Sequence, residues 1–116
     1  MKMEELVEEF ARHVAAQTDA IRRGDARTGN QHARQYAAAL QELRAHGDSG
    51  RDALSVLLGH PRTDVRAMAA AFLLRYRTAE AKAVLEAAAK EGGAAAIGAI
   101  MTLRRWEDGT WALDPG

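Results

Sequence analysis

Several residue types that carry chemistry or stabilise small folds are scarce in this chain. It has no cysteine, which excludes disulfides and thiolate chemistry and is compatible with a reducing compartment. Sixteen basic and sixteen acidic residues cancel, so the chain lacks the net positive charge of a dedicated nucleic-acid binder. It has neither the apolar core of a signal peptide at its start nor the run of roughly 18 apolar residues that a membrane span needs. We therefore expect a soluble cytoplasmic protein that does not associate with a membrane.

Aromatic residues are also few. They make up 5% of the chain, whereas 47% of the residues are hydrophobic and many of these are alanine. Burial therefore depends on the close approach of helices more than on bulky side chains, and a partner surface could supplement so thin a core. Because no shift in composition marks a linker within the 116 residues, we predict a single domain over residues 1–116.

The sequence does contain a succession of helix patterns, and the first two are the longest. Apolar residues recur at spacings of three and four over residues 3–23, which predicts an amphipathic helix. Gly24 is suited to end it, and either Asp25 or Thr28 can cap a second helix that runs to about His46. So short a connection predicts an antiparallel helical hairpin over residues 1–47. The apolar positions of the first helix are Met3, Leu6, Val7, Phe10, Val14 and Ile21.

Shorter helices follow, separated by glycine and proline. They bring the total to about six, the last four covering residues 51–58, 63–74, 78–90 and 94–105. Pro61 prevents continuation of the third helix, Thr63 or Asp64 is expected to cap the fourth, and Thr78 the fifth. Apolar positions overlay at a shift of roughly 28 to 30 residues, so residues 49–105 are interpreted as two degenerate helical hairpins. The last helix carries Ile97, Ile100, Met101 and Leu103.

The tail, residues 106–116, differs in character because it places an Asp-Gly turn between two tryptophans. We interpret it as non-helical. Trp106 and Trp111 are expected to fold back over the open end of the last helix pair, where an alanine-rich core gains from a large aromatic cover. The alternative is that Trp111 is exposed and serves as an anchor for a binding partner.

One segment resembles a known repeat. The sequence from Leu57 to Pro61, followed by Asp64-Val65-Arg66 and Ala69-Ala70, is similar to the HEAT-type helical repeat. Together with the Arg23-Gly24-Asp25 joint and the ending Met101-Thr102-Leu103, the chain resembles the bacterial domain-of-unknown-function family 2019 over nearly its whole length. The resemblance implies a HEAT-like all-α fold, an α-α superhelix, and it implies no catalytic residues. Residues 92–95, Gly-Gly-Ala-Ala, depart from the repeat pattern.

Reactive groups are isolated in the sequence. His13 and His32 lie on the two long helices, where counting outward from the turn puts His13 near Tyr36 and His32 near Gln17. The chain has no His-x-x-x-His or Glu-x-x-His spacing, and its two serines, Ser49 and Ser55, stand in no nucleophile elbow. We expect no catalytic residue, no metal ligand and no cofactor.

Arginines form the polar set of greatest interest. Arg62, Arg66 and Arg75 lie on or beside the fourth helix, and Arg104 and Arg105 lie on the sixth. If the second helices of stacked hairpins line one surface, these side chains form a basic strip suited to a partner rich in carboxylates. The alternative for Arg66 is an ion pair with an acid on a neighbouring helix that holds the stack together.

Three functional hypotheses follow from these patterns. The first is a non-enzymatic protein–protein interaction domain, such as an immunity or adaptor protein, with a curved helical-repeat surface that binds another protein. Its predicted contact residues are Arg62, Arg66, Arg75, Arg104, Arg105 and Trp111. The second is nucleic-acid binding through the arginine strip, which zero net charge disfavours. The third, an enzyme or metal carrier centred on His13 and His32, has the least support.

Overall fold

The computed structural model describes residues 2–111. Within them the chain forms six α-helices and one 3-10 helix and contains no strand, which confirms the prediction of an all-α fold. The helices group into two compact units, the first ending at Leu57 and the second starting at Leu58. Each unit is described separately, and the single-domain and HEAT-like arrangements stay predictions. No helix in the described part of the chain is long and apolar enough to cross a membrane.

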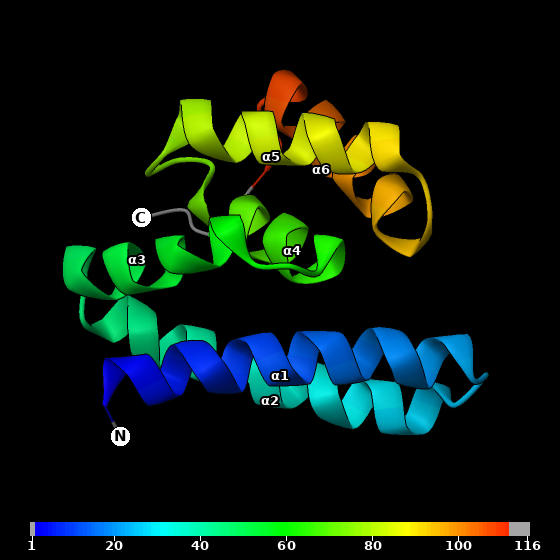
Figure 1. The fold of residues 1–116 in the computed structure, drawn as a ribbon. Coiled ribbons are helices and arrows are strands. Elements are labelled where there is room, and N and C mark those ends of the chain that lie inside the picture. The colour runs from blue at the N-terminus through cyan, green and yellow to red at the C-terminus, as the bar shows by residue number, and fades with distance from the viewer. Residues whose placement is uncertain (1, 112–116) are drawn as a thin grey trace. The chain divides into compact units, whose positions relative to one another are not determined.

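The first unit is built on two long helices. α1 (Met3–Arg22) and α2 (Ala26–Ala45) lie side by side, as the blue and cyan ribbons of Figure 1 show. Phe10, Val14 and Leu43 are almost completely buried, in agreement with the apolar stripes. Ile21 differs, since it is exposed. Its side chain faces Gly29, where there is no side chain to cover it.

The joint between α1 and α2 is stabilised by backbone and side-chain capping. The N–H of Asp25 donates to the carbonyl of Ala20, and that of Gly24 to the carbonyl of Ile21. Asp25, not Thr28, is the N-cap of α2, because its carboxylate accepts a hydrogen bond of 3.1 Å from the N–H of Thr28. These hydrogen bonds end α1 and start α2 within a few residues, so the connection between the two helices is short.

α3 (Asp48–Ser55) begins three residues earlier than predicted and gives way to the 3-10 helix η1 (Val56–Gly59). The early start follows from Gly47, whose φ of 64° turns the chain directly into the helix. α3 then packs very closely against the end of α2. A Cβ atom on the buried Gly50 would stand 1.7 Å from the carbonyl oxygen of Leu43, so this contact requires glycine.

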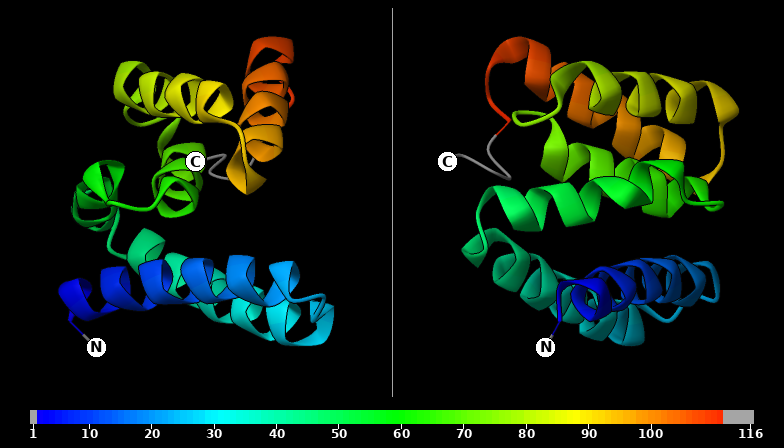
Figure 2. Two further views of the ribbon diagram at one scale, coloured as in Figure 1. Left: turned by 45° about the vertical axis from the view of Figure 1, so that its right-hand side comes forward. Right: turned by 60° about the vertical axis from the view of Figure 1, so that its left-hand side comes forward.

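The second unit contains α4 (Thr63–Leu73), α5 (Thr78–Glu91) and α6 (Ala94–Asp108), which contact one another (Figure 2). Most of α4 is buried, and none of its residues is fully exposed. Much of the packing is made by alanine, which permits the helices to approach closely. The fully or nearly fully buried alanines are Ala69, Ala70, Ala81, Ala88 and Ala99.

The predicted caps of α4 and α5 are wrong. Arg62 and Arg77 occupy the N-cap positions, and neither helix has a side-chain cap bond. The hydroxyl of Thr63 contacts the carboxylate of Glu91, while the hydroxyl of Thr78 donates to the carbonyl of Leu74 at 2.6 Å. The two hydroxyls that local sequence rules assign to helix capping therefore have other partners. That of Thr63 contacts a residue distant in sequence, and that of Thr78 donates to a carbonyl of the preceding turn.

The segments that flank α6 rely on glycine. Gly92 and Gly93 join α5 to α6 with φ of 76° and 78° and ψ of −166° at both residues. At the other end α6 continues through Asp108, so the prediction that residues 106–108 are non-helical is wrong. The Asp-Gly turn is the helix cap itself, because Gly109 is left-handed and its N–H bonds to the end of the helix. The rest of the predicted tail, residues 112–116, lies outside the described residues.

Candidate functional site

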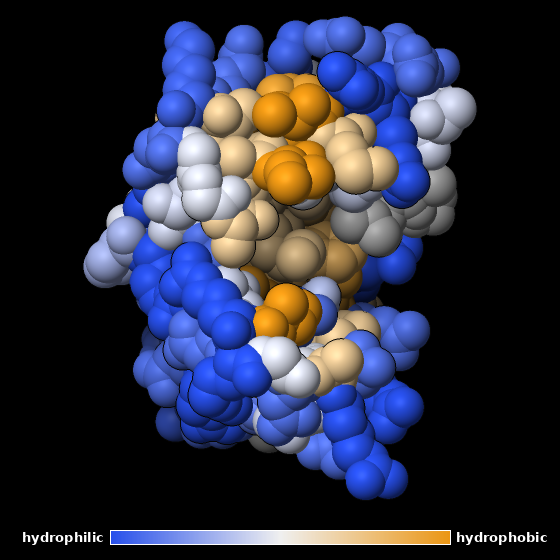
Figure 3. All heavy atoms as spheres, turned by 90° about the vertical axis from the view of Figure 1, so that its right-hand side faces the viewer, coloured by the Kyte–Doolittle hydropathy of each residue, from blue (hydrophilic) through white to orange (hydrophobic). Residues whose placement is uncertain are grey.

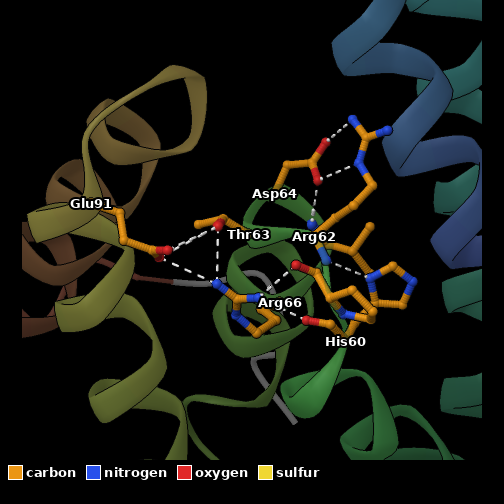
Figure 4. A network of polar contacts seen from close by, with 8 residues as sticks. His60, Arg62, Thr63, Asp64, Arg66 and Glu91 are labelled. Atoms are coloured by element: carbon orange, nitrogen blue, oxygen red, sulfur yellow. Dashed lines mark hydrogen bonds and ion pairs between the residues drawn. The ribbon is translucent and has the colours of Figure 1, made fainter.

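Arg66 is the centre of a polar network at the start of α4 (Figure 4). One guanidinium nitrogen donates to the carbonyls of His60 and Pro61, at 2.7 and 3.0 Å. The other donates to the hydroxyl of Thr63 at 2.9 Å and to a carboxylate oxygen of Glu91 at 3.2 Å. The structure thus contains the ion pair between Arg66 and a neighbouring helix that was expected as the alternative to partner binding. Arg66 ties the proline turn to α4 and α5.

Arg62 is held beside this network. Its guanidinium makes two hydrogen bonds of 3.0 Å to the carboxylate of Asp64, a bidentate geometry that fixes the side chain. Its backbone N–H donates to Nδ1 of His60 at 3.0 Å, which gives that histidine a role in the turn. Two of the five arginines of the predicted strip therefore serve the local structure of the α4 start.

The remaining arginines of the predicted strip lie elsewhere in the second unit. Arg75 follows the end of α4, about 16 Å of helix away from Arg62. Arg104 and Arg105 are exposed on the last turns of α6. The role of these three arginines in partner binding stays a prediction.

Trp111 packs against its own unit. Its indole N–H donates a hydrogen bond of 2.8 Å to the carbonyl of Ala71, near the end of α4, and the residue is half-buried. Carbonyls in the last turn of a helix lack partners within the helix, so the indole satisfies one of them. Trp111 therefore folds back onto its own unit, and the helix that its indole N–H reaches is α4.

α6 is apolar on its buried side and also on much of its exposed side. The side chains that it buries are small, namely those of Ala96, Ala99 and Thr102. Its larger apolar side chains point to solvent, with exposed fractions of 70% for Ile97, 39% for Ile100 and 48% for Met101. Figure 3 shows apolar surface in its upper half, on the side of the molecule where α6 begins. We refer to Ile97, Ile100 and Met101 as the α6 strip.

The electrostatic setting of the α6 strip is uneven along the helix. No charged residue occurs between Ala94 and Leu103. Arg104 then follows Met101 and Ile100 at spacings of three and four residues, and Arg105 follows Met101 at four, so both arginines adjoin the strip on the helix surface. Neither arginine has an ion pair within the part of the chain that the structure describes. Glu107 and Asp108 confine this positive charge to about one turn.

The two histidines of the first unit contact each other directly, with their Nδ1 atoms 2.9 Å apart. Counting outward from the turn places each near a residue of the other helix but does not identify this contact. Tyr36, one turn after His32 on α2, packs edge-on against Phe10. Among residues 2–111, no group of three or more His, Cys, Asp or Glu side chains is arranged to hold a metal ion.

Comparison with known proteins identifies the family. Residues 4–107 match the model of the domain of unknown function DUF2019, and the chain belongs to this family. It is also similar to a solved structure, that of the protein RPA1889 from Rhodopseudomonas palustris CGA009. The two share 31% sequence identity with a TM-score of 0.88, over 95% of this chain and 92% of the other. No curated protein matches the sequence.

Proposed function

We propose that this protein is a non-enzymatic interaction domain that binds another protein through the α6 strip. The observation that carries the proposal is which side chains of α6 are buried. Its small alanine and threonine side chains are buried, whereas the large apolar side chains of Ile97, Ile100 and Met101 are exposed to solvent. A helix that is apolar on both sides is normally buried on both sides. The exposed side of α6 is therefore suited to being covered by a partner.

The energetics favour an apolar contact at this strip. Full burial of an isoleucine or methionine side chain contributes about 1.5–3 kcal/mol, and Ile97 is mostly exposed in this chain. Binding energy at interfaces concentrates in a few such side chains surrounded by polar residues. Ile97 is at the centre of the uncharged part of α6, whereas Arg104 and Arg105 border it.

The charge beside the strip defines the partner further. Two arginines without ion pairs in the described part of the chain follow the apolar side chains, so the partner should present apolar residues flanked by carboxylates. Guanidinium groups bind carboxylates in a bidentate manner and give such a contact its orientation. An immunity or adaptor protein would use this kind of surface against its target.

Nucleic-acid binding remains the alternative proposal, and the positions of the arginines give it less support. Arg62 and Arg66 donate to acceptors in their own unit, which leaves few guanidinium groups for phosphates. Loss of all binding to DNA and RNA at about 50 mM salt would eliminate this alternative, because phosphate contacts are strongest at low salt.

The proposal is tested by site-specific photo-crosslinking in the native cell. A photoreactive residue replaces Ile97, and the matched control replaces Val56, which is 73% exposed but lies outside α6. We expect position 97 to crosslink to a protein that position 56 does not reach. With the purified partner, Ile97→Glu should weaken binding by about 10-fold or more, since a central apolar contact is lost, and Val56→Glu should leave it unchanged.

Four results would contradict the proposal. Position 97 could give no crosslink above the level of position 56, or the captured protein could bind the Ile97→Glu variant as tightly as the parent chain. Crosslinks between two copies of this chain would replace the foreign partner with self-association. Crosslinks to nucleic acid would favour the alternative function instead.

A further inference from the structure

His13 and His32 form a direct hydrogen bond between the two long helices of the first unit. Their Nδ1 atoms are 2.9 Å apart and their ring centroids 5.2 Å apart. The other nitrogen of His13, Nε2, lies 3.2 Å from a carboxylate oxygen of Glu9, one helical turn away. The second oxygen of Glu9 accepts from the guanidinium of Arg12. Glu9, His13 and His32 therefore form a continuous chain from α1 to α2.

This chain of hydrogen bonds determines where the protons lie. A carboxylate can only accept, so Nε2 of His13 carries a hydrogen and donates to Glu9. In the neutral ring of His13, Nδ1 is then an acceptor, and the hydrogen between the two rings belongs to Nδ1 of His32. His32 is consequently the Nδ1–H tautomer, and its own Nε2 has a lone pair.

The pair can accept one additional proton but not two. The first enters at Nε2 of His32 and leaves every hydrogen bond intact. A second proton must bind Nδ1 of His13, which is already the acceptor of the bond between the rings. Both facing nitrogens would then carry hydrogens, and two positive rings would stand in contact. Full protonation therefore requires the bond between α1 and α2 to break.

A metal ion fits this geometry less well than a proton. Two imidazole nitrogens on one zinc ion, each about 2.0–2.1 Å from it in a tetrahedral site, are about 3.3 Å apart. The observed separation of 2.9 Å is that of a hydrogen bond. Glu9 contacts the far side of the His13 ring and cannot complete a metal site between the rings.

The charged and titratable groups around the contact between the two rings belong to both helices. α1 contributes Glu9 and Arg12, and α2 contributes His32 and, one turn later, Tyr36. Burial raises the pKa of Tyr36 above its ordinary value of 10.0, an effect that its hydrogen bond to Gln17 partly offsets. Tyr36 is therefore neutral throughout the range in which free imidazoles ionise, and it contributes no charge beside the pair.

We propose that the His13–His32 pair is an acid-sensitive latch that links α1 to α2 at neutral pH and opens when both rings are protonated. The direction follows from counting protons. The folded pair holds one additional proton with its bond intact, whereas the two separated rings of the unfolded chain can each bind one. Because the unfolded state binds more protons, the stability of the hairpin falls as the pH decreases.

The tautomer provides the first test, independent of stability. Two-bond ¹H–¹⁵N spectra of the imidazoles at pH 8 distinguish Nδ1–H from Nε2–H rings. We expect His13 to be Nε2–H and His32 to be Nδ1–H. Two Nε2–H rings would overturn the proposal, because no hydrogen would then lie between them.

The second test compares thermal unfolding at pH 8 and pH 5. His32→Gln keeps a side chain that can either donate to or accept from His13, so it tolerates both protonation states. The midpoint temperature of the parent chain should fall by about 5 °C more than that of His32→Gln, the effect of one lost hydrogen bond. His46→Gln, at the exposed end of α2, is the matched control and should behave as the parent chain.

His13→Gln supplies a second variant should His32→Gln fail to fold. If the midpoint temperature falls equally with acid in the parent chain and in the variant that folds, the proposal is overturned. This holds even if that variant is less stable at both pH values. The proposal would also be overturned if the midpoint temperature of His46→Gln fell as little between pH 8 and pH 5 as that of His32→Gln. The difference from the parent chain would then not depend on the His13–His32 contact.

Discussion

Gly50 is a position where the absence of a side chain decides whether two helices can meet. Because a Cβ atom there would stand 1.7 Å from the carbonyl oxygen of Leu43, Gly50→Ala must push α3 away from α2. We expect the free energy of unfolding to fall by about 3 kcal/mol, at the upper end of the range for overpacked sites. Chemical denaturation measures this change.

The matched control is Gly98→Ala in α6. A Cβ atom at Gly98 meets nothing within 4 Å, and the residue is exposed in the middle of a helix. Alanine should therefore raise the free energy of unfolding by about 0.4–1 kcal/mol, because it restricts the unfolded chain. Equal effects at the two glycines would contradict the close contact at Gly50.

Asp25 gives the start of α2 a dependence on pH. The hydrogen bonds of its carboxylate with Thr28, first through the side chain and then through the backbone N–H, lower its pKa. The ionised carboxylate therefore stabilises the folded state above about pH 3.9, the value of a free aspartate, and this contribution is lost as the pH falls through the lowered pKa.

Thermal unfolding of Asp25→Ala should show this pattern. The variant should melt below the parent chain at pH 7, and the difference should shrink as the pH decreases from 4 to 2. Asp25→Asn should remain close to the parent chain at pH 7, because asparagine is also a good N-cap. A difference between Asp25→Ala and the parent that is constant with pH would exclude the carboxylate as its source.

At the scale of elements, Arg66 is the residue that joins the proline turn to α4 and α5. Arg66→Met retains the aliphatic stem but removes bonds to two carbonyls, a hydroxyl and a carboxylate. We expect the free energy of unfolding to fall by about 1.5–3 kcal/mol, the range for hydrogen bonds of a charged group. Glu91→Gln should lower it by less than about 1 kcal/mol, because the side chain of that partner is 49% exposed and its ion pair is screened by solvent.

The two results separate the contributions of the turn and of the ion pair. If Arg66→Met and Glu91→Gln destabilise the protein equally, the ion pair with α5 is the main contribution. If neither variant changes the denaturation midpoint, the network is not part of what stabilises α4.

Element boundaries were predictable where the signals are local. Asp25 and Gly24 define the α1–α2 joint by capping rules that need no tertiary contact. The capping prediction failed at Thr63 because the hydroxyl bonds to Glu91, which is 28 positions away. The pairing of His13 with His32 was missed for the same kind of reason, since the relative register of packed helices depends on how their side chains interdigitate.

The orientation of α6 could not be predicted from its pattern. Between Ala94 and Leu103 every position is uncharged, so the sequence gives no polar face that would identify the solvent side. In the structure α6 buries its alanine face, because small side chains allow it to pack closely against α4 and α5. The all-α class and the family, by contrast, followed from patterns spread over the whole chain.

At the scale of the whole molecule, the balance of charge removes electrostatic repulsion between copies. The formal net charge is zero and the isoelectric point is about 6.9. We therefore expect the solubility to be lowest near neutral pH, where the exposed α6 strip can associate without opposition. Precipitation by polyethylene glycol, followed from pH 5 to 9, measures this minimum.

Two variants of equal charge identify the source of the low solubility. Ile97→Glu with Met101→Glu adds two charges and removes apolar surface, whereas Ala83→Glu with Ala87→Glu adds two charges on exposed positions of α5. The first pair should raise the solubility at pH 7 more than the second. Equal gains would mean that net charge alone governs association.

The joint between α5 and α6 has a consequence for the handedness of the chain. At Gly92 and Gly93 the backbone angles are the mirror image of ordinary extended backbone. Glycine, the one achiral residue, is the only natural residue that adopts them without strain. A D-alanine introduced by chemical synthesis would match both positions in conformation, whereas its L-enantiomer would not. Over these two residues the protein has a stereochemical requirement that the genetic code can meet only with glycine.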